Sequence, residues 1–509
     1  MHVEREIKFH LPPDAAQRLS RHVHPAGPWR RRALSSVYYD TREGRLRRAG
    51  VALRLRRDGA RRIQTLKAEG GAGGAFAARA EWEMPAPRGR LDVAAFPREE
   101  ILAATGLDIT ALAPQLRPVF ETHFGRRAAT VSVDGATRAE VAVDRGYIAA
   151  GARREPIEEL EVELKAGDTA SMLRYAAGLA APLSLALAFE SKAERGYRLM
   201  AGEAAPEPQK WRRPALPELA SPAEAFAALF NAALAQVGEN ARGVARAGDP
   251  EYLHQMRVGL RRLRSALLAF RNLVPRKAAK PLTARLRRLM PPLGAARDWD
   301  VFCENLVRLG TQAPSRAPAI AQLLARAREK RAAARKRARE AAASRQLQAF
   351  LMDALVWVHV APWTARAARA ETAFALFAAN ALQRLHRKAL KRAGDIDWRD
   401  AQQRHRLRIR MKRLRYACDF FAASFAGAAA RPYLKSLAAL QDVLGDLNDV
   451  AVARRLLAEL APRGAPTGMP AAAAYVRRAL GARERQLIAA LGPAWNAFEK
   501  RRVFWQPRG

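Results

Sequence analysis

The chain has 509 residues, of which 49% are hydrophobic and 27% charged, so it is long enough for about two to four domains and is not a disordered polar chain. Its 89 lysine and arginine side chains against 49 aspartate and glutamate side chains leave a net charge of +40, which favours a polyanionic partner. Two cysteines exclude a disulfide scaffold. Residues 1–20 lack the apolar segment of a signal peptide, and no apolar run is long enough to span a bilayer, so we expect a soluble, cytoplasmic protein.

The positive charge is distributed unevenly along the chain. Residues 1–202 carry 33 basic and 25 acidic side chains, a net charge of +8, and the rest carries +32. The first part alternates polar and apolar residues in short runs, as β-strands do, whereas the second is rich in alanine, leucine and arginine at helical spacing. Five prolines lie within Glu203–Pro222 and predict a semi-rigid linker. We therefore predict an α+β multidomain chain, with a β domain at 1–202, a linker at 203–220 and a helical domain at 221–505.

The first predicted strand alternates charged and apolar side chains. Because successive side chains of a strand point to opposite faces, Glu4, Glu6 and Lys8 share one face. The same alternation recurs further along, for example at 51–56 and 160–165. An antiparallel sheet with one solvated face would also produce this pattern.

The composition of the polar faces argues for a closed site. The strands place carboxylates two residues apart and arginines two residues apart, and closing the sheet would bring both sets into one lumen. Clustered carboxylates repel one another unless a divalent cation such as Mg²⁺ or Mn²⁺ neutralises them. Clustered arginine and lysine side chains require an anion with several oxygens. A metal-bound polyphosphate satisfies both requirements.

These residues resemble the CYTH, or triphosphate tunnel metalloenzyme, superfamily over residues 1–200. The N-terminal Glu4-x-Glu6-x-Lys8 is similar to the opening motif of that family. Further matches follow in the family's order, at Tyr38–Thr41, Leu53–Arg56, Thr65–Lys67, Glu161–Lys165 and Ser191–Tyr197. The resemblance implies an antiparallel β-barrel whose lumen is a tunnel that binds triphosphate together with Mg²⁺ or Mn²⁺.

The resemblance also implies roles for individual residues. The residues expected to hold the metal are Glu4, Glu6, Asp144, Glu161 and Glu163. Those expected to bind the phosphates are Lys8, Arg54, Arg56, Lys67, Arg117, Arg126, Lys165 and Lys192, with Arg127 as the alternative to Arg126. The expected catalytic residues are Glu4, Glu6, Lys8 and Lys192. Glu81 and Glu83 match a further charged strand, but the sequence leaves open which of them faces inward and which carboxylate positions the attacking water.

The helical part contains an internal repeat. The segment His254–Arg264 aligns without a gap with His405–Arg415, and Leu293–Asp298 aligns with Leu444–Asp449, both at an offset of 151 residues. Two separate segments that share one offset indicate a duplication. We therefore expect two related helical bundles packed together.

Each copy of the repeat carries a basic stripe. At about 100° per residue, His254, Arg257, Arg261 and Arg264 fall on one side of a helix. No acidic residue lies in the interval 255–272 to compensate them, so this row of like charges indicates an anion lying along it. The second copy repeats the stripe, and the two stripes either line one groove or form separate patches.

These segments resemble the CHAD domain, a helical module that often follows a CYTH domain, over residues 221–505. The family implies that the basic surface binds inorganic polyphosphate. The expected polyphosphate-binding residues are His254, Arg257, Arg261, Arg262, Arg264, His405, Arg408, Lys412, Arg413 and Arg415. We expect Asp298 and Asp449 to cap helices or orient arginines rather than to act in catalysis.

The two resemblances together predict a metal-dependent hydrolase that converts inorganic triphosphate to pyrophosphate and phosphate and holds polyphosphate on its helical part. Two alternatives stay open: a polyphosphate-docking protein without catalytic activity, and a CYTH enzyme that acts on thiamine triphosphate or cyclises ATP. The basic stripes are not interleaved with stacking aromatic residues, and no nucleic-acid-binding motif occurs. We therefore expect no specific nucleic-acid partner, no membrane partner and a cytoplasmic location in association with polyphosphate granules. The oligomeric state stays open.

Overall fold

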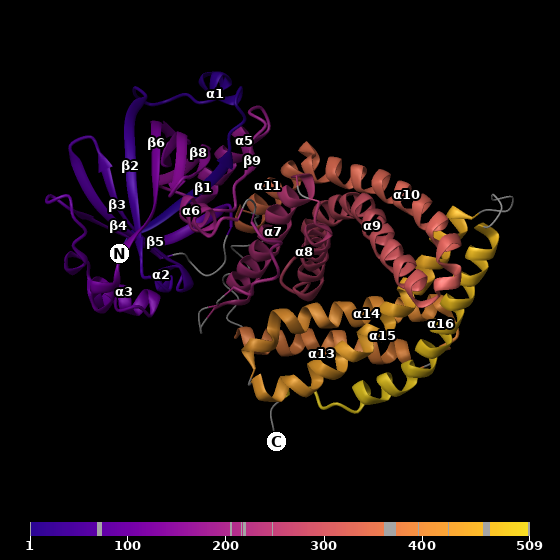
Figure 1. Ribbon diagram of the computed structural model, residues 1–509. Coiled ribbons are helices and arrows are strands. Elements are labelled where there is room, and N and C mark those ends of the chain that lie inside the picture. Colours follow the sequence, from indigo (N-terminus) through magenta and orange to yellow (C-terminus); the bar gives the residue numbers. More distant parts are fainter. Residues whose placement is uncertain are drawn as a thin grey trace. The chain divides into compact units, whose positions relative to one another are not determined.

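A computed structural model of the chain describes residues 2–68, 74–203, 206–214, 216, 220–246, 248–360, 373–394, 396–425, 427–461 and 469–506 (Figure 1). The chain divides into two compact units. Unit 1 comprises Met1–Ala215, Asn231–Gly243 and Ser344–Ala361, and unit 2 comprises Leu216–Phe230, Val244–Ala343 and Pro362–Gly509. The domain boundaries predicted from the sequence stay a proposal. Of the predicted linker, residues 204, 205, 215 and 217–219 lie outside the described residues.

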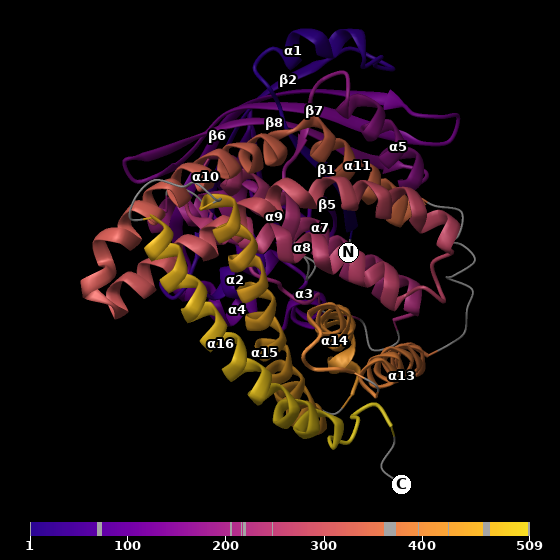
Figure 2. The same ribbon diagram turned by 90° about the vertical axis from the view of Figure 1, so that its right-hand side faces the viewer.

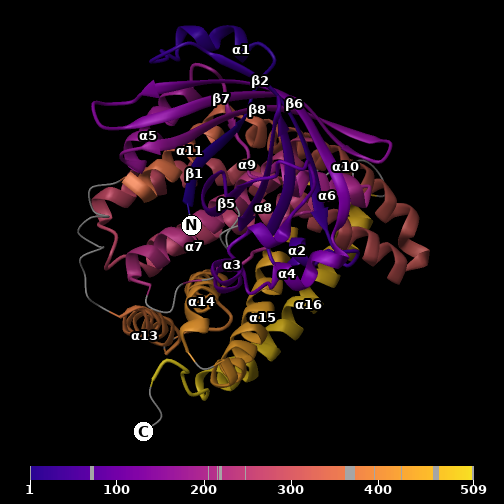
Figure 3. The same cartoon turned by 90° about the vertical axis from the view of Figure 1, so that its left-hand side faces the viewer.

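Unit 1 is built around a sheet of antiparallel strands (Figure 3). The strands are β1 (His2–His10), β2 (Arg30–Asp40), β3 (Val51–Asp58), β4 (Arg61–Ala68), β5 (Phe76–Pro85), β6 (Arg117–Ser132), β7 (Arg138–Ala150), β8 (Arg153–Ala166) and β9 (Ala186–Leu187). Their order is β5-β4-β3-β2-β6-β7-β8-β1-β9, and a further pairing between β1 and β5 closes β1 to β8 into a ring. The antiparallel β-barrel predicted from the sequence is confirmed.

Alternation along the strands places charged side chains inside the barrel and many apolar side chains outside it. On β1, Glu6 and Lys8 line the lumen, whereas Ile7 and Phe9 are completely buried on the opposite face of the strand. The hydrophobic core of unit 1 therefore includes a layer on the outer face of the barrel, where helices must cover it.

Helices supply that cover. Those of unit 1 are α1 (Ala15–Arg18), α2 (Arg45–Arg48), α3 (Arg98–Thr105), α4 (Ile109–Leu112), α5 (Thr169–Ala180), α6 (Lys192–Ala201) and α11 (Arg345–Val360). Ile101 of α3 and Ile109 of α4 join a buried cluster with Leu53, Leu66 and Trp82 on the outer face of β3, β4 and β5. Helix α5 packs against β1 and β8, and α11 packs against α5.

Helix α6 reaches the lumen itself. It begins after a capping box, in which Ser191 and Glu194 exchange side-chain-to-backbone hydrogen bonds, and it packs against β6, β7 and β8. A Cβ atom at Gly196 would lie 2.2 Å from the ring of Phe120, so glycine permits this close approach. The cap fixes the first residue of the helix, Lys192, at the lumen.

Unit 2 is helical (Figure 2). Its helices are α8 (Pro250–Ala269), α9 (Arg276–Gln312), α10 (Ala317–Ala343), α13 (Phe374–Ala393), α14 (Ala401–Phe421), α15 (Gly427–Leu460) and α16 (Met469–Glu499), while α7 (Pro222–Arg246) contributes residues to both units. Helix α9 packs along α10 and α15 packs along α16, and α8 contacts both α9 and α14. The helical C-terminal region predicted from the sequence is confirmed.

The helices of unit 2 recur with the spacing of the sequence repeat. Helix α14 begins 151 residues after α8, and α15 begins 151 residues after α9. Helix α16 begins 152 residues after α10. The same helix order with the same spacing supports the internal duplication inferred from the sequence.

Two further features of the described residues bear on the sequence predictions. No helix in the described ranges is both long enough and apolar enough to cross a membrane. Cys303 and Cys418 are buried, unbridged thiols, so they pack as small core side chains.

The turn after β2 depends on one buried carboxylate. The Asp40 side chain is fully buried, and its Oδ1 accepts hydrogen bonds from the backbone N–H groups of Thr41 (2.7 Å) and Leu46 (2.8 Å). Its Oδ2 accepts from the N–H of Arg47 and from the hydroxyl of Tyr197, each at 3.0 Å. Asp40 therefore ties the start of α2 to helix α6.

We predict that Asp40→Ala lowers the free energy of unfolding by about 3 kcal/mol, because it leaves several buried donors without acceptors. The measurement is chemical denaturation followed by circular dichroism. The exposed Asp14 provides the control, and Asp14→Ala should change stability by less than about 0.5 kcal/mol. Equal effects of the two substitutions would contradict this role for Asp40.

Candidate functional site

The barrel encloses a cavity of about 310 Å³. Most of the side chains that line it are charged, and they come from all of the strands β1 to β8 and from helix α6. Among the described residues, the cations at the cavity are Lys8, Arg32, Arg54, Arg56, Lys67, Arg79, Arg126, Lys165 and Lys192, and the carboxylates are Glu4, Glu6, Glu81, Glu83, Glu140, Glu161 and Glu163.

The two kinds of charge are concentrated on opposite walls. Strands β3, β2 and β6 are neighbours in the ring, and the charged groups they turn to the cavity are arginines. Strands β5, β1 and β8 are also neighbours, and they carry every cavity carboxylate except Glu140 of β7. Three cations, Lys8, Arg79 and Lys165, share this second wall. We call the two sides the arginine wall and the carboxylate wall.

Lysines hold the carboxylate wall together. Lys67 Nζ lies 2.5 Å from Glu4 Oε2 and 3.2 Å from Glu81 Oε1, and Lys8 Nζ lies 2.9 Å from Glu6 Oε1. Burial alone would lower the pKa of Lys8, but the charges of Glu6 and a second carboxylate outweigh it and raise the pKa to about 12. Lys8 therefore stays protonated at neutral pH.

Glu163 shows that the carboxylate wall lacks positive charge at one point. Burial raises the pKa of this side chain, and the nearby charges of Glu4 and Glu6 raise it further. Lys165, 2.6 Å away, opposes the shift without cancelling it. Glu6 and Glu163 are direct partners on β1 and β8, so their side chains occupy adjacent positions on one face of the sheet.

The arginine wall lacks negative charge at Arg56. Burial lowers the pKa of Arg56 to about 9, and the positive charges of Arg54 and Arg126 add to that effect. The buried Nε of Arg54 has no acceptor in the described part of the chain. A bound anion would stabilise the charged form of such a side chain.

A third group of charges lies where the two walls meet at helix α6. Lys192 Nζ lies 2.9 Å from Asp144 Oδ2, 2.6 Å from Glu159 Oε2 and 2.8 Å from Glu161 Oε1. Burial alone would lower the pKa of Lys192, but these carboxylates hold it well above the ordinary value. Arg126 also contacts Asp144 and Glu161.

The structure brings most of the sequence-predicted barrel residues to the cavity. Those that line it are Glu4, Glu6, Lys8, Arg54, Arg56, Lys67, Arg126, Glu161, Glu163, Lys165 and Lys192. Asp144 is fully buried and is not among the lining residues. Arg117, at the start of β6, is exposed and is not among them either. Arg127 turns away from the cavity and lies over the ring of Trp29.

Sequence reasoning missed several lining residues. They are Arg32, Tyr38, Arg79, Glu140 and Ser191. Arg79, Glu81 and Glu83 follow one another at intervals of two residues along β5, so all three face the cavity. The alternation that indicated Glu81 and Glu83 therefore indicated Arg79 as well. Glu140 stands opposite Glu163 in the pairing of β7 with β8. The signal for it was the alternation that places it on the same strand face as Asp144.

The carboxylate wall fits a divalent cation by its chemistry. Within the described residues, no three His, Cys, Asp or Glu side chains converge closely enough to hold a metal ion, since Glu4 contacts Lys67 and Glu6 contacts Lys8. Carboxylate oxygens are the donors that Mg²⁺ and Mn²⁺ prefer. A cation there would relieve the repulsion that raises the pKa of Glu163.

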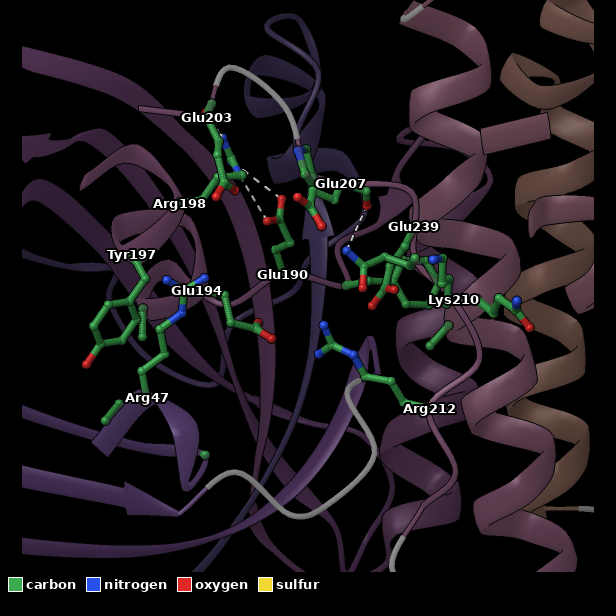
Figure 4. A pocket seen from close by; sticks show the side chains of 18 of the residues that line it. Arg47, Glu190, Glu194, Tyr197, Arg198, Glu203, Glu207, Lys210, Arg212 and Glu239 are labelled. Carbon is green, nitrogen blue, oxygen red and sulfur yellow. Dashed lines mark hydrogen bonds and ion pairs between the residues drawn. The ribbon is translucent and has the colours of Figure 1, made fainter. Parts of the chain in front are cut away.

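A second cavity of about 510 Å³ lies elsewhere in unit 1 (Figure 4). It is lined by α2, α6, Glu203, residues of the segment 206–212 and the 232–242 part of α7. Its opposite charges are intermixed rather than segregated, and Arg198 Nε donates to Glu190 at 3.1 Å. Burial and Glu194 raise the pKa of Glu239 to about 8. This cavity has no arginine wall, so the smaller lumen is the better candidate for a phosphate site.

In unit 2 the two predicted basic stripes meet. Helices α8 and α14 contact each other, and two cations of each act electrostatically on those of the other. The first cation cluster, as we call it, comprises Arg257, Arg261, Arg408 and Lys412. The stripes therefore form one cluster at this point and not two separate patches.

The first cation cluster is short of negative charge. Burial and Arg261 lower the pKa of Arg257 to about 10. Burial and Arg408 lower the pKa of Lys412 to about 7. Asp298 opposes the shift of Arg257, and Asp449 of α15 opposes that of Lys412, each only in part.

The nearby aspartates do not fully balance the positive charge of the first cation cluster. Burial raises the pKa of Asp298, although Arg257 and Arg455 act to lower it. Asp298 is also engaged by Arg455 at 3.4 Å. Asp298 and Asp449 therefore lie among the arginines, as orienting partners would.

The other predicted polyphosphate-binding residues have varied surroundings. His254 is partly buried near Arg257, and burial lowers its pKa. Arg262 pairs with Asp419 at 3.3 Å and lies over the ring of Tyr416. Burial still lowers its pKa, so Asp419 balances its charge only in part.

The remaining predicted residues lie towards the ends of the stripes. His405 and Arg415 are exposed, and Arg415 donates to Gln441 at 3.3 Å. Arg264 and Arg413 act on each other electrostatically and take no part in the first cation cluster.

We predict that Lys192→Met lowers the free energy of unfolding by about 3 kcal/mol, because it removes the cation that three buried carboxylates share and leaves their balance to Arg126 and Arg195. Denaturant titration measures the effect. Lys165→Met is the matched control, since Lys165 is 41% exposed and pairs with one carboxylate, and should cost less than about 1 kcal/mol. A loss below 1 kcal/mol for Lys192→Met would contradict the described charge network.

Comparison with known proteins identifies both parts of the chain. Residues 2–197 match the CYTH domain, and residues 228–458 match the CHAD domain. An inorganic triphosphatase from Haemophilus influenzae is 30% identical over 207 residues, which are 40% of this chain and 56% of that relative. The chain thus spans a little over half the length of this curated relative.

A solved structure matches the helical part. The CHAD domain from the plant Ricinus communis is 34% identical, with a TM-score of 0.51, and the match covers 58% of this chain and 97% of that one. The chain therefore carries an N-terminal CYTH domain, the domain of divalent-metal-dependent triphosphate tunnel enzymes, and a C-terminal CHAD domain.

Proposed function

We propose that the barrel hydrolyses inorganic triphosphate to pyrophosphate and phosphate, and that the helical domain holds inorganic polyphosphate. The observation that carries the first part is the segregation of charge in the lumen. Arg56 on the arginine wall has too little negative charge around it, and Glu163 on the carboxylate wall has too little positive charge. A triphosphate bound together with a divalent metal supplies both at once.

The arginine wall would bind the phosphates. Arg54, Arg56 and Arg126 are buried, and each guanidinium can donate several hydrogen bonds to phosphate oxygens. Binding would raise the pKa of Arg56 from about 9 towards its ordinary value. Part of the binding free energy therefore comes from relieving the repulsion that Arg54 and Arg126 exert on Arg56.

Glu4, Glu6 and Glu163 would hold Mg²⁺ or Mn²⁺, with Glu161 and the buried Asp144 behind them as further members of the predicted set. When bound, such an ion neutralises phosphate oxygens and lowers the pKa of a coordinated water. The lysines complete the charge balance. Lys8 lies between Glu6 and Glu161, at 2.9 and 3.6 Å, and its raised pKa keeps it a cation that can stabilise charge on the leaving phosphate.

The lining favours an inorganic substrate over an organic triphosphate. A thiamine or adenine group requires apolar or aromatic surface. Among the described lining residues, Tyr38 is the one aromatic side chain, and Ala52 and Ala193 are the apolar ones. The other lining residues, apart from Ser191, are charged, which suits a ligand made of phosphate alone.

The first cation cluster supports the second part of the proposal. Its four cations come from two helices and depress one another's pKa values. A polyanion lying across α8 and α14 would relieve that repulsion at several points. A uniform phosphate chain supplies negative charge at several points, and its binding requires no side chain that recognises nucleic-acid bases.

We predict that the full chain releases phosphate from tripolyphosphate in the presence of Mg²⁺ or Mn²⁺, and that Glu6→Ala and Lys8→Ala each reduce kcat/KM at least about 100-fold, as loss of one charge-stabilising group does elsewhere. The measurement is phosphate release with ATP and thiamine triphosphate as competing substrates. Arg5→Ala is the control, because Arg5 is on the same strand but is exposed.

Equal rates for wild type, Glu6→Ala and Lys8→Ala would contradict the proposed site. No hydrolysis of any of the three substrates, with retained binding of long polyphosphate, would favour the docking function instead. Faster hydrolysis of thiamine triphosphate or ATP than of tripolyphosphate would contradict the inorganic substrate.

We predict that polyphosphate binding weakens about tenfold between pH 6 and pH 8, because Lys412 has a pKa of about 7 when free and must be protonated to bind an anion. Calorimetric titration at each pH measures the affinity and the proton uptake. In Lys412→Arg the side chain stays charged, so most of this pH dependence should disappear. An unchanged pH profile in Lys412→Arg would contradict the role of Lys412.

A further inference from the structure

Glu159 is a buried carboxylate that has no part in the proposed binding of metal or phosphate. Its side chain is 1% exposed, and its Oε2 lies 2.6 Å from Lys192 Nζ. Strand β8 places Glu159 two residues before Glu161, on the same face of the sheet. Glu159 is nevertheless not among the described residues that line the lumen. Its link to the lumen is therefore its contact with Lys192.

The other two carboxylates around Lys192 have a different set of contacts. Asp144 and Glu161 both contact Arg126 as well. These three residues belong to the sets proposed to hold the metal and the phosphates, so a bound metal-triphosphate would draw on them. Glu159 belongs to neither set. It is the carboxylate partner of Lys192 that a ligand in the lumen leaves in place.

Arg195 fixes the position of Glu159. Arg195 is 5% exposed and lies one helical turn after Lys192 on α6. Its Nη1 donates to Glu159, and its Nε donates to Glu155 Oε1 at 2.8 Å. Its Nη2 donates to the carbonyl oxygen of Pro156. Because a guanidinium is planar and donates in a fixed fork, three acceptors on β8 allow it one position.

The alternation of charges continues along α6. Arg198, a further turn along, contacts Glu155 Oε2 at 2.8 Å and Glu190 Oε1 at 3.1 Å (Figure 4). We call the whole row the charge ladder; in order it comprises Lys192, Glu159, Arg195, Glu155, Arg198 and Glu190. Every member helps to hold α6 on the barrel, but Glu159 is the member that contacts Lys192.

A lysine needs such support more than most side chains do. Lysine is among the residues that lose the most rotamer freedom when they are ordered. A carboxylate that holds the ammonium group in advance removes this cost from the reaction, because a preorganised charge need not rearrange as negative charge develops. A misplacement of about 1 Å in such a group costs about 100-fold in rate.

We propose that Glu159 is a positioning residue for the hydrolysis: held by Arg195, it keeps the Lys192 ammonium at the wall of the lumen, where Lys192 stabilises the charge that develops on the phosphate. This inference rests on the proposed triphosphate hydrolysis. Glu159 itself touches neither phosphate nor metal and acts through Lys192.

The test uses the full chain and three single substitutions of glutamate by glutamine, which keeps the size of the side chain and removes its charge. Glu159→Gln is the variant. Glu155→Gln breaks the charge ladder at a point that does not contact Lys192. Glu158→Gln is the control, because Glu158 is the neighbouring residue and is exposed. Thermal unfolding without metal establishes which variants are folded, and phosphate release from tripolyphosphate gives kcat and KM.

We expect Glu159→Gln to lower kcat about 10-fold to 100-fold and to leave KM within about threefold, because the arginine wall is intact and the lost interaction matters in the transition state. The Mn²⁺ concentration that gives half-maximal activity should also stay within about threefold. Glu155→Gln and Glu158→Gln should each keep kcat within about threefold of wild type, although Glu155→Gln lowers the unfolding temperature.

A double-mutant comparison shows whether Glu159 acts through Lys192. Added to Lys192→Met, Glu159→Gln should change the remaining kcat by less than about twofold. If Glu159→Gln does not fold, Glu159→Asp takes its place with the same expectations, since aspartate keeps the charge but withdraws the carboxylate from Lys192.

The inference is overturned if kcat is the same in Glu159→Gln and Glu158→Gln. Equal losses of kcat in Glu159→Gln and Glu155→Gln would also overturn it, because the charge ladder would then serve only to hold α6. A large rise in the Mn²⁺ requirement of Glu159→Gln would make Glu159 a metal ligand instead, and a full additional loss in the Lys192→Met background would show that it does not act through Lys192. A wild-type chain that does not hydrolyse tripolyphosphate would contradict the proposed function itself.

Discussion

Repulsion between like charges held out of water is the constraint on which the rest of the structure depends. A barrel with charged side chains inside cannot close unless those charges are balanced, and salt bridges such as Lys67 to Glu4 provide much of that balance. The balance is incomplete at two places. The pKa of Arg56 falls on one wall and that of Glu163 rises on the other. The hydrophobic layer on the outer face of the strands supplies the stability that permits this incomplete balance.

The helical domain meets the same constraint in a different way. Its cations are arranged along α8, α13 and α14, and apolar residues on the other faces of those helices form the core. The first cation cluster retains two aspartates, which balance its cations only in part. The lumen thus suits a compact ligand with its own cation, and the helices suit an extended anion without one. The proposed function assigns a short phosphate chain to the barrel and a long one to the helices.

The sequence predicted the barrel and most of the lumen because alternation on a strand is a local property. Glu4, Glu6 and Lys8 could be placed on one face from their spacing alone. It could not predict that Arg117 is exposed and Asp144 fully buried, because those positions depend on how the sheet closes. Glu140 could have been included from the sequence, because alternation places it on the same strand face as Asp144.

The central claim is that the opposed walls of the lumen bind triphosphate and a divalent metal together. A crystal structure of the chain with Mn²⁺ and a non-hydrolysable triphosphate analogue tests it directly, because Mn²⁺ is located by its anomalous scattering. The account predicts Mn²⁺ beside Glu4, Glu6 and Glu163 and phosphate oxygens against Arg54 and Arg56. Anomalous density outside the barrel, or an analogue bound in the lumen without contact to the arginine wall, would contradict it.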